Sequence, residues 1–272
     1  MPIEDGSLEA EVYGSGTPSV LVIQTALLVS ELAPLSRALA VPGASAAVVH
    51  CHRRGYGRSS PVAPGAAMAD LVADVHQLIG ALGLAPVHVV GASFSSAIAL
   101  ALAASHPRDV HTLTVVEPPP VQGPTVAQFR ASAAGMLALF DARGAGEALD
   151  DFQHALVGPD WRDWYEAAQP GSAAQMERDA ATFFASDVPA LLNWETGHSA
   201  LGRIRCPVLH VGGQATDPWF REAGEVLRRW LPHLEHVMVP GAGHLLATTH
   251  TDEAARIIRD FIRRHPLPAA GR

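Results

Sequence analysis

The stretch VVGASFSSA, residues 89–97, decides the fold of this chain. Residues 86–91 form a short apolar run of the kind found in strands that are buried on both faces, and an apolar helical pattern begins at Phe94. Ser93 therefore sits on a sharp turn between a strand and a helix, which exposes its hydroxyl. The N-terminus of such a helix also directs N–H groups at any oxyanion that forms beside the serine.

Strand and helix patterns alternate on both sides of this turn. Short apolar runs predict the strands of a mainly parallel sheet, and an antiparallel strand is expected before them over residues 9–13. Segments with apolar residues at a spacing of 3.6 predict helices on both faces, so the fold class is a doubly wound α/β sheet of the eight-stranded type. The expected strands are residues 19–24, 46–51, 86–91, 111–117, 207–212 and 235–240, and the expected helices are residues 31–40, 68–82, 94–105, 218–231 and 251–265.

The alternation stops at three consecutive prolines, residues 118–120, because proline cannot donate a hydrogen bond to a strand ladder. The segment that follows has helical patterns, no convincing strand, and the highest density of aromatic residues in the chain. We therefore expect a core formed by residues 1–118 and 203–272, with an all-helical lid over residues 119–202 that covers the carboxyl edge of the sheet. The aromatic residues of this segment include Trp161, Trp164, Tyr165, Phe183, Phe184 and Trp194.

The composition excludes several classes of protein. The 272 residues are 48% hydrophobic and 17% charged, which is enough apolar material for a sizeable core and argues against a disordered chain. The formal net charge of −8 provides no basic surface for a nucleic-acid duplex, so no nucleic-acid partner is expected. All 19 basic residues are arginine, which excludes enzymes that need a lysine amine for a Schiff base, for pyridoxal phosphate or for a Walker-type nucleotide site.

The cysteines and the N-terminus point to a protein of the cytoplasm. Cys51 and Cys206 lie far apart without a CxxC spacing, so no disulfide framework, iron–sulfur cluster or structural zinc site is expected. Each is interpreted as a small buried residue at the end of a strand. The first residues lack the basic and apolar regions of a signal peptide, and no apolar run is long enough to cross a bilayer, so no membrane partner is expected.

Two histidines and two arginines lie at the end of the predicted strand over residues 46–51 and in the loop that follows it. His50 and His52 lie on one face of the strand, but a metal site needs a further ligand, so no metal is expected. We expect one of them to pack in the sheet and the other to form a hydrogen bond in the loop. Arg53 and Arg54 suggest either an anion site or, as we prefer, a buried guanidinium that anchors the loop.

Four segments, taken in order, resemble the α/β-hydrolase family, and the resemblance covers nearly the whole chain. GASFSSAIALALAASHP is similar to that family's nucleophile elbow, with serine in place of the usual second glycine, and CHRRGYGRSS to its loop after the third strand. PVLHVGGQATDP is similar to the strand and turn that carry its catalytic acid, and VPGAGHLLATTHTDEAARIIRDFIRRH to its histidine loop and closing helix. The order Ser93, Asp217, His244 agrees with the family's order of serine, acid and histidine.

The resemblance implies a role for each of these three residues. Ser93 attacks a carbonyl carbon, and His244 accepts its proton, because a serine hydroxyl is a poor nucleophile at neutral pH without a base. Asp217 would orient the imidazole and stabilise its protonated form. Two alternatives stay open. Glu117, at the end of a predicted strand, could be the acid, in which case Asp217 would be a helix N-cap. His250 could be the base, although it lacks a preceding Gly-rich turn.

The segment after the second predicted strand departs from the family pattern. The family usually has His-Gly there, whereas this chain has Gln24, Thr25 and Ala26. Because backbone N–H groups do not depend on the side chain, we expect those of Ala26 and Phe94 to form the oxyanion hole. Gln24 is a candidate to offer its amide to the site. In the CHRRGYGRSS loop after the third predicted strand, His52 also replaces the aspartate that the family usually has.

We expect a serine hydrolase that cleaves an ester, lactone, thioester or related acyl bond of a small, mainly apolar carbonyl substrate, without cofactor or metal, as a monomer or homodimer. One alternative keeps the fold for a cofactor-free lyase, cyclase or perhydrolase reaction, and the altered segment at Gln24 and Thr25 motivates it. Another is a ligand-binding module with a decayed site. Lid tryptophans often form the core of their own helices, but some should face the serine. The candidate pocket residues are Gln24, Thr25, Trp161, Trp164, Phe183, Phe184 and Trp194.

Overall fold

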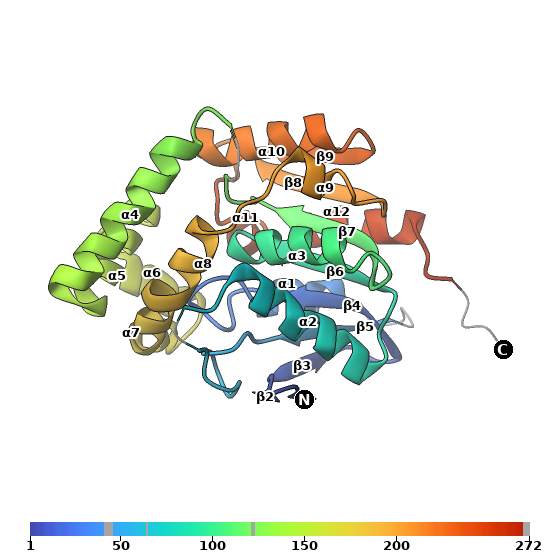
Figure 1. Cartoon of the computed structure of the whole chain (residues 1–272), viewed down its shortest axis with the longest axis horizontal. Helices are drawn as coiled ribbons and strands as arrows, with labels where there is room; N and C mark the ends of the chain where they lie inside the picture. Colours follow the sequence, from blue (N-terminus) through green and yellow to red (C-terminus); the bar gives the residue numbers. More distant parts are fainter. Residues whose placement is uncertain (41–45, 64, 121–122, 269–272) are drawn as a thin grey trace.

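The computed structural model describes residues 1–40, 46–63, 65–120 and 123–268 and has a twisted sheet at its centre (Figure 1). The strand order in this sheet is β3-β5-β4-β6-β7-β8-β9, with only β3 antiparallel to its neighbour. The prediction of a mainly parallel sheet is confirmed, but within the described ranges the sheet has seven strands rather than eight. A two-stranded sheet of β1 (Pro2–Ile3) and β2 (Gly6–Ser7) precedes it.

Each strand of the main sheet forms within two residues of a predicted strand, whereas β1 and β2 were not predicted. Strands β6 and β8 are buried at every position, which is why their sequences do not alternate between apolar and polar residues; each has one buried histidine in an otherwise apolar run. Neighbouring residues Val89 and Val90 belong to hydrophobic clusters on opposite faces of the sheet. The strands of the main sheet are β3 (Ala10–Tyr13), β4 (Thr17–Ile23), β5 (Ala46–Cys51), β6 (Val87–Ala92), β7 (Val110–Val116), β8 (Val208–Gly213) and β9 (Leu234–Val239).

Helices cover both faces of the sheet, as the alternation predicted. The cluster on one face includes residues of α2 (Met68–Leu82), α3 (Phe94–Ser105) and α10 (Pro218–Trp230). The cluster on the other face includes residues of α1 (Ala33–Leu39) and α12 (Thr251–Arg264), which contact each other, and of the short α11 (Leu246–Thr249). Both layers bury the apolar stripe of each helix against the sheet, so the strands cannot slide by one residue without exposing core side chains.

A run of helices separates β7 from β8, and Figure 1 shows α4 to α7 gathered at the left end of the sheet. They have a hydrophobic cluster of their own, which also includes Leu27 and Leu28 from the loop after β4. The insertion therefore packs against the carboxyl edge of the sheet. These helices fall inside the predicted lid, whose residues 121–122 lie outside the described residues. They are α4 (Val126–Arg143), α5 (Ala145–Leu156), α6 (Trp161–Ala168), α7 (Ser172–Thr182), the π-helical turn η1 (Phe183–Asp187), α8 (Val188–Leu192) and α9 (His198–Leu201).

Among the helices of the described residues, none combines the length and the apolar character that a membrane span requires. The longest of these helices, α4, has one fully buried residue, Ala133, so it lies at the surface of the insertion.

Candidate active site

The turn at Ser93 has the strained geometry that the sequence predicts for it. Ser93 has φ 49° and ψ −122°, a backbone conformation that residues other than glycine rarely adopt. Gly91 makes this turn possible, because a Cβ atom there would lie 2.5 Å from the backbone oxygen of Ser95. Ser95, in the place of the family's second glycine, is fully buried, and its hydroxyl donates to the carbonyl oxygen of Ala92 at 3.0 Å. The extra hydroxyl is therefore satisfied inside the turn.

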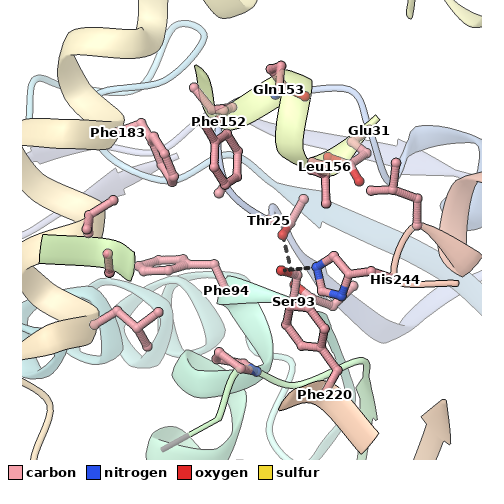
Figure 2. A pocket seen from close by; sticks show the side chains of 18 of the residues that line it. Thr25, Glu31, Ser93, Phe94, Phe152, Gln153, Leu156, Phe183, Phe220 and His244 are labelled. Atoms are coloured by element: carbon pink, nitrogen blue, oxygen red, sulfur yellow. Dashed lines mark hydrogen bonds between the residues drawn. The ribbon is translucent and has the colours of Figure 1, made fainter. Parts of the chain in front are cut away.

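The side chains of Ser93 and His244 meet above this turn (Figure 2). The Ser93 Oγ lies 3.0 Å from the His244 Nε2, within hydrogen-bond distance for a nucleophile and its base. His244 follows β9 on a Gly-rich turn, and the ring of Phe220 stacks on its imidazole with 3.7 Å between centroids. The ring is thus fixed on its flat side by Phe220, a residue that no sequence motif singled out.

Glu117 supplies the carboxylate behind the histidine. Its Oε2 lies 3.3 Å from the His244 Nδ1, and its Oε1 accepts a hydrogen bond from the Gly213 N–H at 2.7 Å. The Thr216 hydroxyl donates to Oε2. Glu117 directly follows β7, and its φ of 49° turns the side chain back over the carboxyl edge of the sheet. A buried carboxylate held by three polar groups can orient the imidazole and stabilise its protonated form.

The predicted pairing of His244 with Asp217 is corrected by this geometry. Asp217 occupies the N-cap position of α10, with φ −58° and ψ 150°, and its side chain is exposed. The sequence is compatible with both possibilities, a helix cap for Asp217 and the acid role for Glu117. The choice between them depends on which of two neighbouring strand ends lies nearer to the imidazole, and this distance is set in three dimensions. His250, the alternative base, occupies the N-cap position of α12, and its Nδ1 lies 2.9 Å from the Thr249 hydroxyl rather than at Ser93.

Unusual backbone conformations concentrate at this edge of the sheet. In the described part of the chain, four residues other than glycine have a positive φ, namely Asp5, Leu27, Ser93 and Glu117. Three of them belong to the site, since Leu27 also lines the cavity beside Ser93. Such conformations cost of order 1–3 kcal/mol each and persist where the surrounding structure holds them in place. Their grouping marks this edge as the functional one.

The residues expected to form an oxyanion hole lie on both sides of Ser93. Ala26 and Phe94 line the same cavity as the serine. Phe94 is the first residue of α3, where backbone N–H groups have no acceptor within the helix. The Thr25 hydroxyl donates to the Ala92 carbonyl oxygen at 2.8 Å, which ties the loop after β4 to the turn that carries the serine (Figure 2). The two N–H groups are thereby held on one rigid frame.

Gln24 faces away from the cavity. Its side chain is fully buried, its Oε1 accepts a hydrogen bond from the Arg53 N–H at 2.8 Å, and it does not line the pocket. Arg53 in turn donates to the carbonyl oxygens of Gln24 and Thr25 and forms a bidentate ion pair with Asp187 of η1, at 2.7 and 2.6 Å. The preferred reading of Arg53 as a loop anchor agrees with these contacts. Gln24 supports the loop and offers no amide to the site.

A cavity of about 140 Å³ opens beside Ser93, and apolar side chains from both the core and the insertion form most of its wall. An enclosed apolar cavity of this size can hold a group as large as benzene. Of the predicted pocket residues, Thr25 and Phe183 line the cavity, whereas Trp161, Trp164, Phe184 and Trp194 do not. Trp161 and Phe184 are instead fully buried in the core of the insertion. Other lining residues include Phe129, Met136, Phe152, Leu156, Met176 and Phe220.

Besides Ser93, His244 and Thr25, the wall contains three polar residues: Glu31, Gln153 and Tyr165. Burial raises the pKa of the Glu31 carboxyl to about 7, although the nearby Thr248 hydroxyl acts to lower it. Burial, together with the charge of Glu31, also raises the pKa of the Tyr165 hydroxyl, which the Gln153 side chain opposes. No sequence pattern marked Glu31 or Gln153, since each is an isolated polar residue in a loop or helix.

The histidines of β5 lie away from the cavity. His50 is fully buried in the sheet, where burial lowers its pKa to about 3, and His52 lies 3.1 Å from the Glu9 carboxylate. Glu11 joins them as a third group, with one possible ligand atom of each within 4.8 Å of the others, but it is exposed and accepts a hydrogen bond from Tyr13. Cys51 is buried, with its pKa raised to about 12, and Cys206 is half-buried.

Comparisons with known proteins agree with this architecture. A family model described as alpha/beta hydrolase fold matches residues 20–251. A fluoroacetate dehalogenase from Burkholderia sp is 29% identical over 239 residues, which cover 79% of this chain and 78% of the dehalogenase. Among solved structures, a thermophilic esterase from Thermogutta terrifontis has a TM-score of 0.78 at 20% identity, covering 96% of this chain and 95% of its own. An enol-lactonase from Burkholderia xenovorans LB400 has a TM-score of 0.74 at 20% identity, covering 96% and 98%.

Proposed function

Since the chain belongs to the alpha/beta hydrolase fold family, we propose that it is a serine hydrolase that cleaves an ester, lactone, thioester or related acyl bond of a small carbonyl substrate. The observation that carries this proposal is the 3.0 Å contact between the Ser93 Oγ and the His244 Nε2, with the Glu117 carboxylate behind the imidazole. An esterase and an enol-lactonase among the structural neighbours support the same class of bond.

The first half of the reaction forms an acyl-enzyme. The Ser93 oxygen attacks the carbonyl carbon while its proton passes to the His244 Nε2, and Glu117 stabilises the imidazolium that results. The N–H groups of Phe94 and Ala26 stabilise the negative charge on the carbonyl oxygen. When the tetrahedral intermediate collapses, the His244 proton goes to the leaving alcohol or thiol, which departs with the electron pair of its bond to carbon.

The second half regenerates the enzyme. A water molecule gives a proton to the His244 Nε2 and attacks the carbonyl carbon of the acyl-enzyme, and the same N–H groups again stabilise the oxyanion. Collapse returns the proton to the Ser93 oxygen and releases the carboxylic acid. Each step uses only residues of this chain and water, so the proposed mechanism requires no metal or cofactor.

The nature of the nucleophile argues against dehalogenation, despite the likeness to a fluoroacetate dehalogenase. Displacement of a halide from carbon by a nucleophilic side chain leaves that carbon bonded to the protein. If the nucleophile is a carboxylate, the product is an ester, which water can hydrolyse. An attack by Ser93 would leave an alkyl ether, which the His244 base could not cleave. Attack on a carbonyl carbon gives an ester in the same position and allows turnover.

Labelling with a fluorophosphonate tests the assignment of the nucleophile. Wild-type protein should be labelled and should hydrolyse p-nitrophenyl acetate. Ser93→Ala should lose the label and lower kcat by about a thousandfold or more, with little change in Tm, because the side chain is partly exposed and makes no contact in the core. Ser105→Ala, an exposed serine at the end of the same helix, is the matched control and should behave as wild type.

Two results would separate the alternatives. Equal labelling of Ser93→Ala and wild type would refute the nucleophile assignment. A labelled Ser93 in a protein that cleaves no activated ester would favour a lyase, cyclase or perhydrolase reaction on the same site.

A further inference from the structure

We propose that Glu31, Gln153 and Tyr165 form a subsite that binds a hydrogen-bond donor of the substrate, either a hydroxyl or an ammonium group. The inference rests on the proposed function and goes beyond it, because it names a polar group that the substrate must carry at a distance from its carbonyl. The subsite belongs to the same cavity as Ser93 but uses none of the residues of the proposed acyl-transfer mechanism.

The three residues come from three separate segments of the chain. Glu31 lies in the turn before α1, Gln153 on α5 and Tyr165 on α6, so one belongs to the core and two to the insertion. All three side chains line the one cavity that also contains Ser93, so a single bound molecule can reach each of them. Figure 2 shows Glu31 and Gln153 on the side of the Ser93–His244 pair that faces away from Phe220. A substrate held at Ser93 would therefore extend toward them.

Gln153 carries an unused hydrogen-bond acceptor. The residue is 1% exposed, its Nε2 donates to the Met176 sulfur at 3.6 Å, and its Oε1 has no hydrogen-bond partner within the described part of the chain. A buried amide oxygen without a partner costs free energy, which a donor on a bound molecule would recover. The residue therefore points to a ligand rather than to a purely structural role.

Glu31 adds a second acceptor and lacks a countercharge. Its carboxyl lies in the cavity wall, and the described residues show no ion pair between it and an arginine or histidine; the neighbour that acts on it is the Thr248 hydroxyl. Burial raises the pKa of Glu31, and no cationic partner among the described residues offsets that rise. A carboxylate and an amide oxygen together favour a donor and repel a carboxylate or phosphate on the substrate. Tyr165 can donate to the oxygen of a bound hydroxyl.

Matched methyl esters test the subsite at two depths of the cavity. The six-carbon set is methyl hexanoate, methyl 6-hydroxyhexanoate and methyl 6-aminohexanoate, and the four-carbon set is methyl butyrate, methyl 3-hydroxybutyrate and methyl 3-aminobutyrate. Hydrolysis is followed by titration of the released acid. Wild type should prefer at least one donor-bearing ester over its plain counterpart by about tenfold or more in kcat/KM.

Variants assign the preference to the subsite. Glu31→Gln and Gln153→Leu should each reduce the ratio of kcat/KM between the donor-bearing and the plain ester toward one. Glu147→Gln, an exposed carboxylate on α5 that pairs with Arg143, should keep the wild-type ratio. A preference for the ammonium over the hydroxyl ester should grow above pH 7 as Glu31 ionises; His244 and Tyr165 are the other titratable groups of the cavity wall.

The outcomes either support or overturn the proposal. The proposal would be overturned if wild type had a ratio of kcat/KM, donor-bearing over plain ester, within twofold of one for all four donor-bearing esters. It would also be overturned if a tenfold preference survived both Glu31→Gln and Gln153→Leu. Failure of the proposed function is recognised separately, by an unlabelled Ser93 and no hydrolysis of any ester. In that case the subsite is tested by binding: 6-aminohexan-1-ol should raise the Tm of Ser93→Ala more than hexan-1-ol does, and equal shifts would refute the subsite.

Discussion

Ser93 and Glu117 each adopt a backbone conformation with φ 49°, and both point a functional group across the carboxyl edge of the sheet. Regular strand or helix geometry would direct these side chains along the sheet faces, into the packed layers. The left-handed conformation turns them instead toward the one open edge, where His244 lies between them. At the scale of single residues, the site depends on local strain that the packed turn at Gly91 and the hydrogen bonds to Glu117 hold in place.

Replacement of the two candidate acids distinguishes their roles. Glu117→Gln should lower kcat for p-nitrophenyl acetate by about 10²–10⁴-fold, because a neutral amide no longer stabilises the imidazolium. Asp217→Asn should change kcat by less than about threefold, because the Asp217 side chain is exposed and makes no capping hydrogen bond, and Glu117 is the carboxylate behind the imidazole. The measurement is kcat at pH 8 for both variants. A larger loss in Asp217→Asn than in Glu117→Gln would contradict the geometry described here.

Glu31 should make the stability of the protein depend on pH. Its pKa is about 7 in the folded state and 4.5 in its ordinary environment, so between these values the folded state binds more protons than the unfolded one. Stability therefore decreases as pH rises from 4.5 to 7 and levels off above. Glu31 is half-buried, so solvent screens part of the effect, which we expect to be on the order of 1–2 kcal/mol.

The difference in unfolding free energy between Glu31→Gln and wild type isolates this contribution. Glutamine does not titrate, so the variant should gain stability relative to wild type as pH rises from 4.5 to 7. Urea unfolding at pH 5 and pH 8 measures the difference. A constant difference at both values would show that the carboxyl has an ordinary pKa.

At the scale of elements, Arg53 connects the loop after β5 to the loop after β4 and to η1 of the insertion. Its guanidinium is buried between the Asp187 carboxylate and the ring of Phe94, 4.6 Å from the ring centroid, and Tyr56 donates to the same carboxylate at 2.6 Å. Burial lowers the pKa of Arg53, but the charge and the hydrogen bonds of Asp187, together with the nearby Tyr56, outweigh burial and raise the pKa overall. One side chain thus supports the loop after β4 and ties the insertion to it.

Removal of this guanidinium should be costly. Arg53→Met leaves the buried Asp187 charge without its partner, so we expect a loss of about 3–5 kcal/mol in unfolding free energy, and lower esterase activity because the loop that carries Ala26 loses its support. Arg54→Met, at the next position, is the matched control: its ion pair with Asp74 is more exposed and should contribute about 1 kcal/mol or less. Chemical denaturation followed by circular dichroism provides both values, and equal losses in the two variants would contradict the anchoring role.

At the scale of the whole molecule, the sheet separates two hydrophobic clusters, and a third fills the insertion. The third cluster is not independent, because Leu27 and Leu28 of the core are part of it and Arg53 pairs with Asp187 across the same boundary. The cavity lies where these parts meet, with Ser93 and His244 supplied by the core and most of the apolar wall by the insertion. Substrate fit therefore depends on how firmly the insertion is held.

This shared packing predicts that the insertion and the core unfold together. Differential scanning calorimetry should show a single transition with equal calorimetric and van't Hoff enthalpies. Far-UV circular dichroism and the fluorescence of the tryptophans, which lie in both parts, should give the same midpoint. Two resolved transitions would show that the insertion is a separate unit.

The amino-acid sequence was enough to predict the sheet and its two helical layers, since apolar periodicity reports directly on which faces are buried. It also determined the turn at Ser93 and the Gly-rich loop of His244, because local backbone geometry requires small residues at those positions. The tertiary structure alone decided between Glu117 and Asp217, turned Gln24 away from the cavity, and brought Glu31 near Gln153 and Tyr165. These contacts join segments far apart in the chain, and their distances depend on how layers pack, which no local pattern of residues encodes.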